Sequence, residues 1–190
     1  MKTFKDLLTK LNACEKAVEW AGDKTIKEVV ETCPRGEWLL WLAYKVDIDV
    51  KPLTLAKAHC ANTVRHLMKD EGSIKAIDTA IAFGEGKATK EELDFARDDA
   101  GRSAAVAADA VRYTHADTNA FYAADAVYAA CHTVTNDSYT AYVAEAAAAT
   151  AVAYGAARAK NQMETADICR KYIGDLIIEK VNAQLKTTEQ

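Results

Sequence analysis

Apolar and polar positions recur along the chain at the spacing of an α-helix. Ile74, Ile77 and Ile81 follow one another at three and then four residues, so they fall on one face of a helix over residues 74–83. The segment Glu37–Tyr44 is apolar almost all the way round, a pattern typical of a helix that is buried or pressed against a partner. The alternation that a β-strand needs persists nowhere, so the sequence predicts an all-α fold.

Capping signals in the sequence predict where the individual helices begin. In a capping box, a polar N-cap residue is followed three residues later by a glutamate, and each side chain binds the other's backbone N–H. This spacing occurs at three pairs: Asn12 with Glu15, Thr25 with Glu28, and Thr89 with Glu92. Further helices are expected over residues 37–44, 53–68, 74–83, 90–112, 117–134, 137–160 and 163–185, with breaks near 34–36, 47–52 and 84–87.

Residues 93–160 are unusually rich in alanine, most densely near 104–110 and 144–149. Alanine has the best helix propensity because it loses no side-chain entropy on ordering. A helix surface of methyl groups also lets neighbouring axes approach near the short end of the usual range, about 8 Å. We therefore expect one compact domain of about eight or nine helices. It would have an N-terminal helical part over 1–88, a close-packed alanine-rich array over 89–186, and a frayed tail at 187–190.

Charge and cysteine content narrow the class of protein. The net charge of -4 argues against non-specific nucleic-acid binding, which needs clustered lysines and arginines. The five cysteines are odd in number, widely spaced and form no CxxC pair, which favours reduced thiols in a cytoplasmic protein. The charged N-terminus has no apolar signal region, and the weakly polar run at 139–157 is too polar for a membrane span. We expect a cytoplasmic protein that binds neither nucleic acid nor membrane.

Candidate residues for catalysis or cofactor binding do not have the spacing that the known motifs require. The loop 84–89 has neither the glycine spacing nor the Lys-Ser/Thr pair of a phosphate loop. His59-Cys60 and Cys131-His132 are adjacent pairs that point about 100° apart on a helix, which disfavours a zinc site. No catalytic residue, metal ligand or cofactor is therefore predicted. The carboxylates set among the alanines, Asp109, Asp125 and Glu145, favour a solvated helix face over a pair of catalytic acids in a groove.

Aromatic and polar residues within the alanine-rich part are the candidate partner-binding residues, because tyrosine and tryptophan dominate interface hot spots. They are Tyr113, Asp117, Phe121, Tyr122, Tyr128, Tyr139 and Tyr142. The alternative is that these large rings fill gaps of a core that is otherwise lined by methyl groups. The sequence leaves both interpretations open.

Five short motifs resemble a known family. They are Cys14-x5-Trp20-Ala21, Arg35-Gly36-Glu37-Trp38-Leu39-Leu40-Trp41-Leu42, His59-Cys60-Ala61, residues 76–80 (AIDTA) and residues 86–93 (GKATKEEL). Together with the alanine runs they are similar to immunity proteins of the Imm-5-like group from bacterial polymorphic toxin systems, which also occur in phage genomes. Glu37 and Asp78 are conservative departures from the family's Asp and Glu. The motif residues that we expect to be structural are Trp20, Arg35, Glu37, Trp38, Trp41, His59 and Cys60.

The resemblance implies a non-catalytic inhibitor that binds a toxin or effector protein and occludes it. A phage-encoded member would inhibit a bacterial defence protein by the same means. Two other functions stay open. One is a helical protein that binds, sequesters or hydrolyses a nucleotide-type small molecule, with a pocket near His115, Asp117 and His132. The other is a structural protein whose alanine faces mediate self-assembly.

Overall fold

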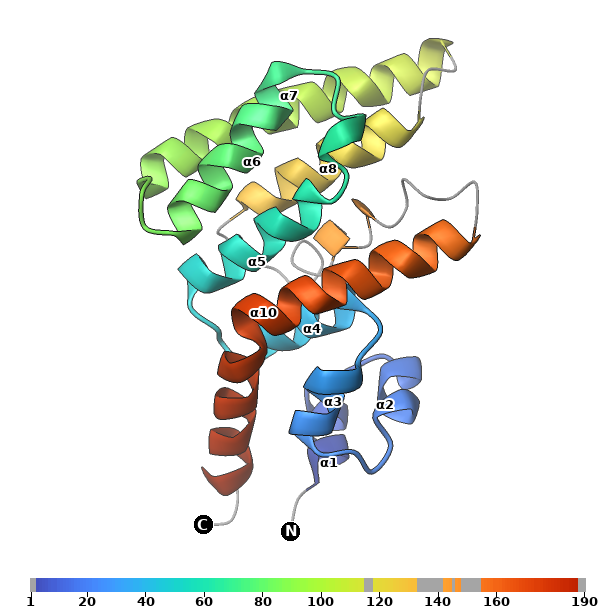
Figure 1. Cartoon of the computed structure of the whole chain (residues 1–190), viewed down its shortest axis with the longest axis vertical. Helices are drawn as coiled ribbons and strands as arrows, with labels where there is room; N and C mark the ends of the chain where they lie inside the picture. The colour runs from blue at the N-terminus through green and yellow to red at the C-terminus, as the bar shows by residue number, and fades with distance from the viewer. Residues whose placement is uncertain (1–2, 115–117, 133–141, 145, 148–154, 188–190) are drawn as a thin grey trace.

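The predicted all-α fold is confirmed. The structure, a computed structural model, describes residues 3–114, 118–132, 142–144, 146–147 and 155–187. For 110–114, 118–121, 155–157 and 187 it describes the backbone only. Every regular element in these ranges is helical, and the helices stack into the elongated molecule of Figure 1.

Three short helices form one end of the molecule: α1 (Phe4–Lys10), α2 (Glu15–Ala21) and α3 (Ile26–Thr32). The expected capping box at Thr25 and Glu28 is present and starts α3. The start predicted for α2 is wrong by two residues, because its N-cap is Cys14. Asn12 instead lies in the turn before it with a φ of 61°, a left-handed conformation that asparagine tolerates better than most residues.

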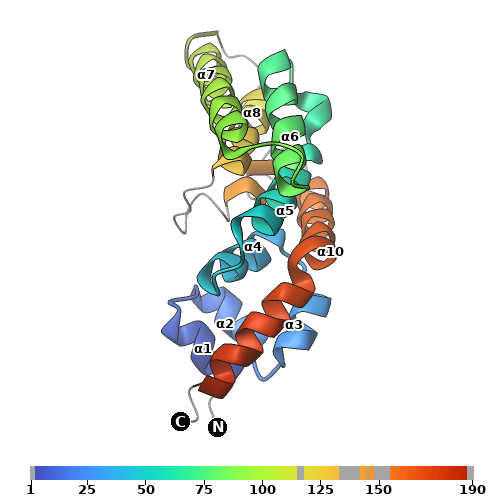
Figure 2. The same cartoon turned by 90° about the vertical axis from the view of Figure 1, so that its left-hand side faces the viewer.

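The middle layer consists of α4 (Gly36–Lys45), α5 (Val50–Asn62) and the long α10 (Gly155–Thr187). Figures 1 and 2 show α10 passing α5 and α4 and then continuing beside the N-terminal helices. Large side chains from α4 and α10 are fully buried here: Leu39, Leu40, Ile173, Ile177 and Val181. The end of the chain therefore completes the core that the first helices begin.

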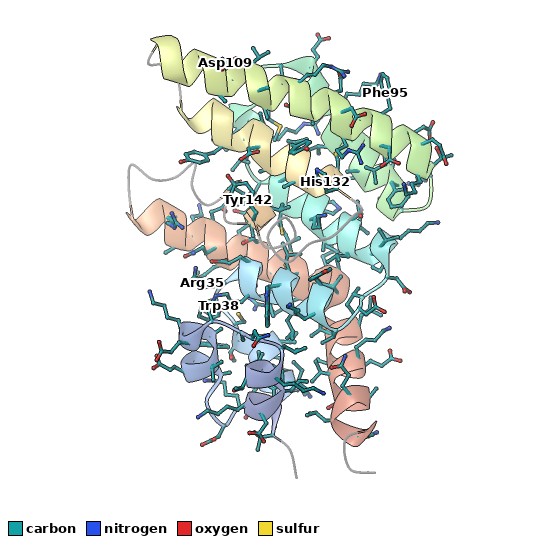
Figure 3. All side chains as sticks on the ribbon, turned by 180° about the vertical axis from the view of Figure 1, so that it is seen from behind. Arg35, Trp38, Phe95, Asp109, His132 and Tyr142 are labelled. Atoms are coloured by element: carbon teal, nitrogen blue, oxygen red, sulfur yellow. The ribbon has the colours of Figure 1, made fainter. Side chains whose placement is uncertain are left out.

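The other end holds a short 3-10 turn, η1 (Arg65–Leu67), and three helices, α6 (Glu71–Gly84), α7 (Lys90–Thr114) and α8 (Thr118–Cys131). In Figures 1 and 3, α7 is the outermost of these helices, with α6 and α8 packed along it. The contacts of α7 and α8 use many buried alanines: Ala96, Ala100, Ala123, Ala126, Ala129 and Ala130. Small side chains thus make up much of this core.

Of the predicted breaks, one is shorter than expected and one is wrong. The break at 47–52 is shorter than expected, because α5 starts at Val50 and places Pro52 in its first turn, where proline fits a helix. The predicted gap between 160 and 163 does not exist, because α10 runs straight through it. Its Asn161 and Gln162 side chains donate to Thr63 and Glu37, 3.0 and 3.1 Å away, so tertiary contacts support helix at these positions.

We predict that Ala147→Leu destabilises the fold. Ala147 is fully buried, and Ala146 beside it is almost fully buried, whereas residues 148 and 149 lie outside the described ranges. Three added carbon atoms would overfill this contact, at a cost of about 1–3 kcal/mol in the free energy of unfolding. Urea denaturation of the variant measures this loss. Ala159→Leu, at an exposed position of α10, is the control, and equal stability of the two variants would contradict methyl-mediated packing.

Candidate functional site

The most exposed side of α7 is a narrow stripe, which we call the α7 outer face. Its members all face solvent: Glu91, Phe95, Asp98, Arg102, Val106 and Asp109. At about 100° per residue, these positions fall within an arc of about 80° around the helix axis. Figure 3 shows Phe95 and Asp109 on the same outer helix, at the end of the molecule away from Arg35 and Trp38.

Two large apolar side chains stand on the α7 outer face. Phe95 is 65% exposed and Val106 is 71% exposed, the highest values among the large hydrophobic side chains that the structure describes. They are 11 residues apart, which is three helical turns and about 16 Å along the axis. Single exposed apolar residues are ordinary on protein surfaces, but two at the same angle on one helix make a paired contact surface.

Charge on the α7 outer face is mainly negative. Three carboxylates, Glu91, Asp98 and Asp109, accompany a single guanidinium, Arg102. The ends of two of these side chains are held by ion pairs along the helix. Arg97 lies 2.9 Å from Asp98, and Arg102 lies 2.8 Å from Asp99.

The opposite side of α7 fixes the helix to the rest of the molecule. Leu93 and Ala100 are fully buried, and the Thr89–Glu92 pair caps the first turn as predicted, with bonds of 2.7 and 3.2 Å. The ring of Tyr128 on α8 packs so closely on Gly101 that a Cβ atom at this glycine would lie 2.9 Å from the ring. The stripe is therefore carried on a well-anchored helix.

The tyrosines predicted as partner-binding lie elsewhere. Tyr122, Tyr128 and Tyr142 are half-buried, and Tyr128 and Tyr142 pack against the core. Tyr142 donates a 2.6 Å hydrogen bond to Asp125. The side chains of the other candidates lie outside the described part of the chain: Tyr113, Asp117, Phe121 and Tyr139. So do His115, named for the small-molecule pocket, and Glu145, one of the three carboxylates set among the alanines.

The tryptophan box is brought together at the opposite end. Arg35 pairs with the Glu37 carboxylate at 2.5 Å and places its guanidinium 4.6 Å from the ring of Trp38. Trp20 lies beside Trp38, with ring centroids 5.9 Å apart. Trp20, Glu37, Trp38 and Trp41 line a cavity between α1, α2, α3 and α4. The sequence pattern singled out these residues without predicting a cavity.

The His59-Cys60 pair splits between two environments. His59 stacks on Tyr172 of α10 with ring centroids 4.5 Å apart, and burial followed by the nearby Lys171 ammonium lowers its pKa. The Cys60 thiol is buried 3.9 Å from that of Cys169. Within the described residues, no three His, Cys, Asp or Glu side chains converge as metal ligands would.

The sequence contains a signal for the exposure of Phe95 but none for the burial of Lys57. Phe95 follows Asp94 and lies three residues before Asp98, and an aromatic residue among carboxylates is a signal for an exposed ring. Nothing around Lys57 in the sequence indicates that it is fully buried, with its ammonium 2.6 Å from the backbone carbonyl of His132.

Comparisons with known proteins give no neighbour. Neither family models, curated proteins nor solved structures match this chain. Among the helices that the structure describes, none is long and apolar enough to cross a membrane.

Proposed function

We propose that the protein is a non-catalytic inhibitor of the immunity-protein type, which binds a toxin or effector protein and occludes it. In a phage, the target would be a bacterial defence protein. The observation that carries the proposal is the exposure of Phe95 and Val106 at one angle of a helix whose other side is packed in the core. The resemblance of the tryptophan box to immunity proteins supports the same function.

The chemistry of the α7 outer face specifies the partner surface. Phe95 and Val106 require two apolar depressions about 16 Å apart. The excess of carboxylates over Arg102 favours a partner that is basic around those depressions, because complementary charge speeds association and selects partners. Since buried residues anchor α7 from Leu93 to Ala104, this part of the helix would lose little conformational freedom on binding, which favours affinity.

We predict that the double variant Phe95→Ala/Val106→Ala fails to neutralise its target. Each hot-spot side chain contributes about 2 kcal/mol or more, so affinity should fall at least about 30-fold for each truncation. Co-expression with the product of the adjacent gene tests this, with bacterial growth and the dissociation constant of the purified pair as readouts. The wild type should restore growth and the double variant should not.

Met163→Ala is the matched control. Met163 is exposed on α10 but does not belong to the α7 outer face, so its truncation should leave growth rescue intact. Equal rescue by wild type and double variant would refute α7 as the docking surface. A wild-type protein that instead forms homodimers, which the double variant converts to monomers in light scattering, would refute inhibition of a separate protein and favour self-assembly.

A further inference from the structure

The cavity at the tryptophan box opens to the protein surface. Its volume is about 150 Å³, and its walls come from α1, α2, α3 and α4. All three tryptophans of the chain, Trp20, Trp38 and Trp41, line it. Cys14 lines it as well and is exposed to solvent, so one edge of the cavity is open. An apolar cavity of this size holds a molecule of about the size of benzene.

The lining itself contributes little net charge. Among the described residues that line the cavity, Glu37 is the only charged one. It is 6% exposed, and its Oε1 atom accepts hydrogen bonds from Arg35 at 2.6 Å and from Gln162 at 3.1 Å. Because Arg35 neutralises this carboxylate, Glu37 does not exclude an anion from the cavity. A ligand would contact mainly indole rings and aliphatic side chains.

Positive charge borders the cavity. Each of its three indole rings has a cationic side chain beside it: Lys24 with Trp20, Arg35 with Trp38, and Lys45 with Trp41. The distances from cation to ring centroid are 4.6, 4.6 and 5.7 Å in that order. Since Arg35 balances Glu37, the two ammonium groups are in excess of the carboxylate in the lining. This charge disfavours a cationic ligand and favours an anionic one.

Lys24 is the cation best placed to bind an anion. Its half-buried side chain donates one hydrogen bond, of 2.6 Å, to the backbone carbonyl of Trp20, and it forms no ion pair within the described residues. The Glu28 carboxylate is close enough to sense the charge of Lys24 but is bonded to Thr25 at the start of α3. An ammonium has three N–H donors, so two remain for a ligand.

We propose that this cavity binds a small aryl carboxylate of the phenylacetate type, with the ring inside the cavity and the carboxylate on the Lys24 ammonium. Offset and edge-to-face contacts with indole rings favour an aromatic occupant over an aliphatic one. A ring packed on Trp20 has its centre about 4.5–7 Å from the indole centroid, which is compatible with a carboxylate on a one-carbon linker reaching Lys24. This site lies at the end of the molecule away from Phe95, so it is independent of the proposed inhibition.

Tryptophan fluorescence tests the proposal directly, because every tryptophan of the chain lines the cavity. Titrations with phenylacetate, toluene, phenethylammonium and propionate separate the ring from the charge. We expect a saturable change with phenylacetate and binding at least about tenfold weaker for the other three, since a hydrogen bond between charged groups is lost in each or the ring is missing. Absence of saturation with phenylacetate would overturn the proposal. Equal binding of toluene would overturn the role of the cations, and equal binding of propionate would overturn the role of the cavity.

Variants at Lys24 test the ion pair. Lys24→Met should lower the preference for phenylacetate over toluene by about tenfold, and Lys24→Arg should retain it. Because this preference is a ratio measured within one protein, it does not depend on the stability of the variant. Lys180→Met, which removes the same charge from an exposed position of α10, should leave the preference unchanged. A Lys24→Met protein with the wild-type preference would refute this ion pair.

A filled cavity and a chemical probe locate the ring. Ala17→Phe should occupy the cavity and abolish the phenylacetate response, while Ala159→Phe on α10 should leave it unchanged. Cys14 is the one exposed cysteine, and phenylacetate should slow its alkylation in the wild-type protein. A phenylacetate response that Ala17→Phe retains, or alkylation that phenylacetate leaves unchanged, would refute this location.

Discussion

Replacing Gly84 with alanine is expected to lower the free energy of unfolding by about 2–3 kcal/mol. Gly84 is the last residue of α6, at its contact with α5. A Cβ atom there would lie 2.5 Å from the Cβ of Leu55, 2.8 Å from its Cα and 3.0 Å from its backbone nitrogen. Because two of these three atoms belong to the backbone, rotation of a side chain cannot relieve the overlap, and α5 and α6 would have to separate.

Urea denaturation and the melting temperature both measure this loss. Lys75→Ala, at an exposed position of the same helix, is the control and should change stability by less than about 0.5 kcal/mol. Adding Leu55→Ala to the Gly84 variant should not rescue it, because the Cα and nitrogen atoms remain. A Gly84→Ala protein as stable as the wild type would show that the two helices are not held at this separation.

A second glycine, Gly36, also allows two helices to approach closely. Neither of these close contacts can be read from the sequence. Gly36 starts α4, and a Cβ atom there would lie 2.7 Å from the backbone carbonyl carbon of Thr165 on α10. By sequence alone Gly36 belongs to a turn and Gly84 to a loop, since glycine marks breaks more often than helix crossings. The contact partners are 129 and 29 residues away along the chain, so local pattern cannot reveal them.

Features set by neighbouring residues were predictable. Capping boxes depend on residues three apart, and those at Thr25 and Thr89 form as expected. Helical periodicity likewise predicted the all-α class. The continuity of α10 was not predictable, because Asn161 bonds to a residue 98 positions away and Gln162 to one 125 positions away.

The candidate site was predictable only in outline. Sequence reasoning selected aromatic rings for partner binding, but Tyr128 and Tyr142 are half-buried and pack against the core, whereas Phe95 and Val106 face solvent. The residue type shows that a side chain is hydrophobic, but it does not show whether that side chain faces solvent or the core. On α7 this depends on which side of the helix packs on α6 and α8. The tryptophan box was recognised as a motif, and its cavity follows from α1, α2 and α3 folding against α4.

We expect the free energy of unfolding of the wild-type protein, minus that of a Lys57→Met variant, to rise by about 1 kcal/mol between pH 7 and pH 9. Lys57 is fully buried on α5, and desolvation lowers the pKa of its ammonium from 10.5 to about 8, although the nearby Cys131 opposes this shift. Between these two values the unfolded chain holds a proton that the folded protein has lost. Stability therefore increases with pH, by about 3 kcal/mol over the whole interval.

Urea denaturation at several pH values measures how the free energy of unfolding changes with pH. The difference between the two proteins separates the contribution of Lys57 from that of the buried thiols. Burial raises the pKa of Cys33 to about 11 and that of Cys131 to about 12, so these thiols reduce stability as the pH rises above about 8, where thiols of the unfolded chain begin to ionise. Both proteins carry these thiols, so comparing the two proteins removes most of this contribution. Lys51→Met, at an exposed position of α5, should retain the wild-type slope. Parallel curves for wild type and Lys57→Met would mean that this ammonium stays protonated in the fold, stabilised by the carbonyl end of α8 more strongly than burial penalises it.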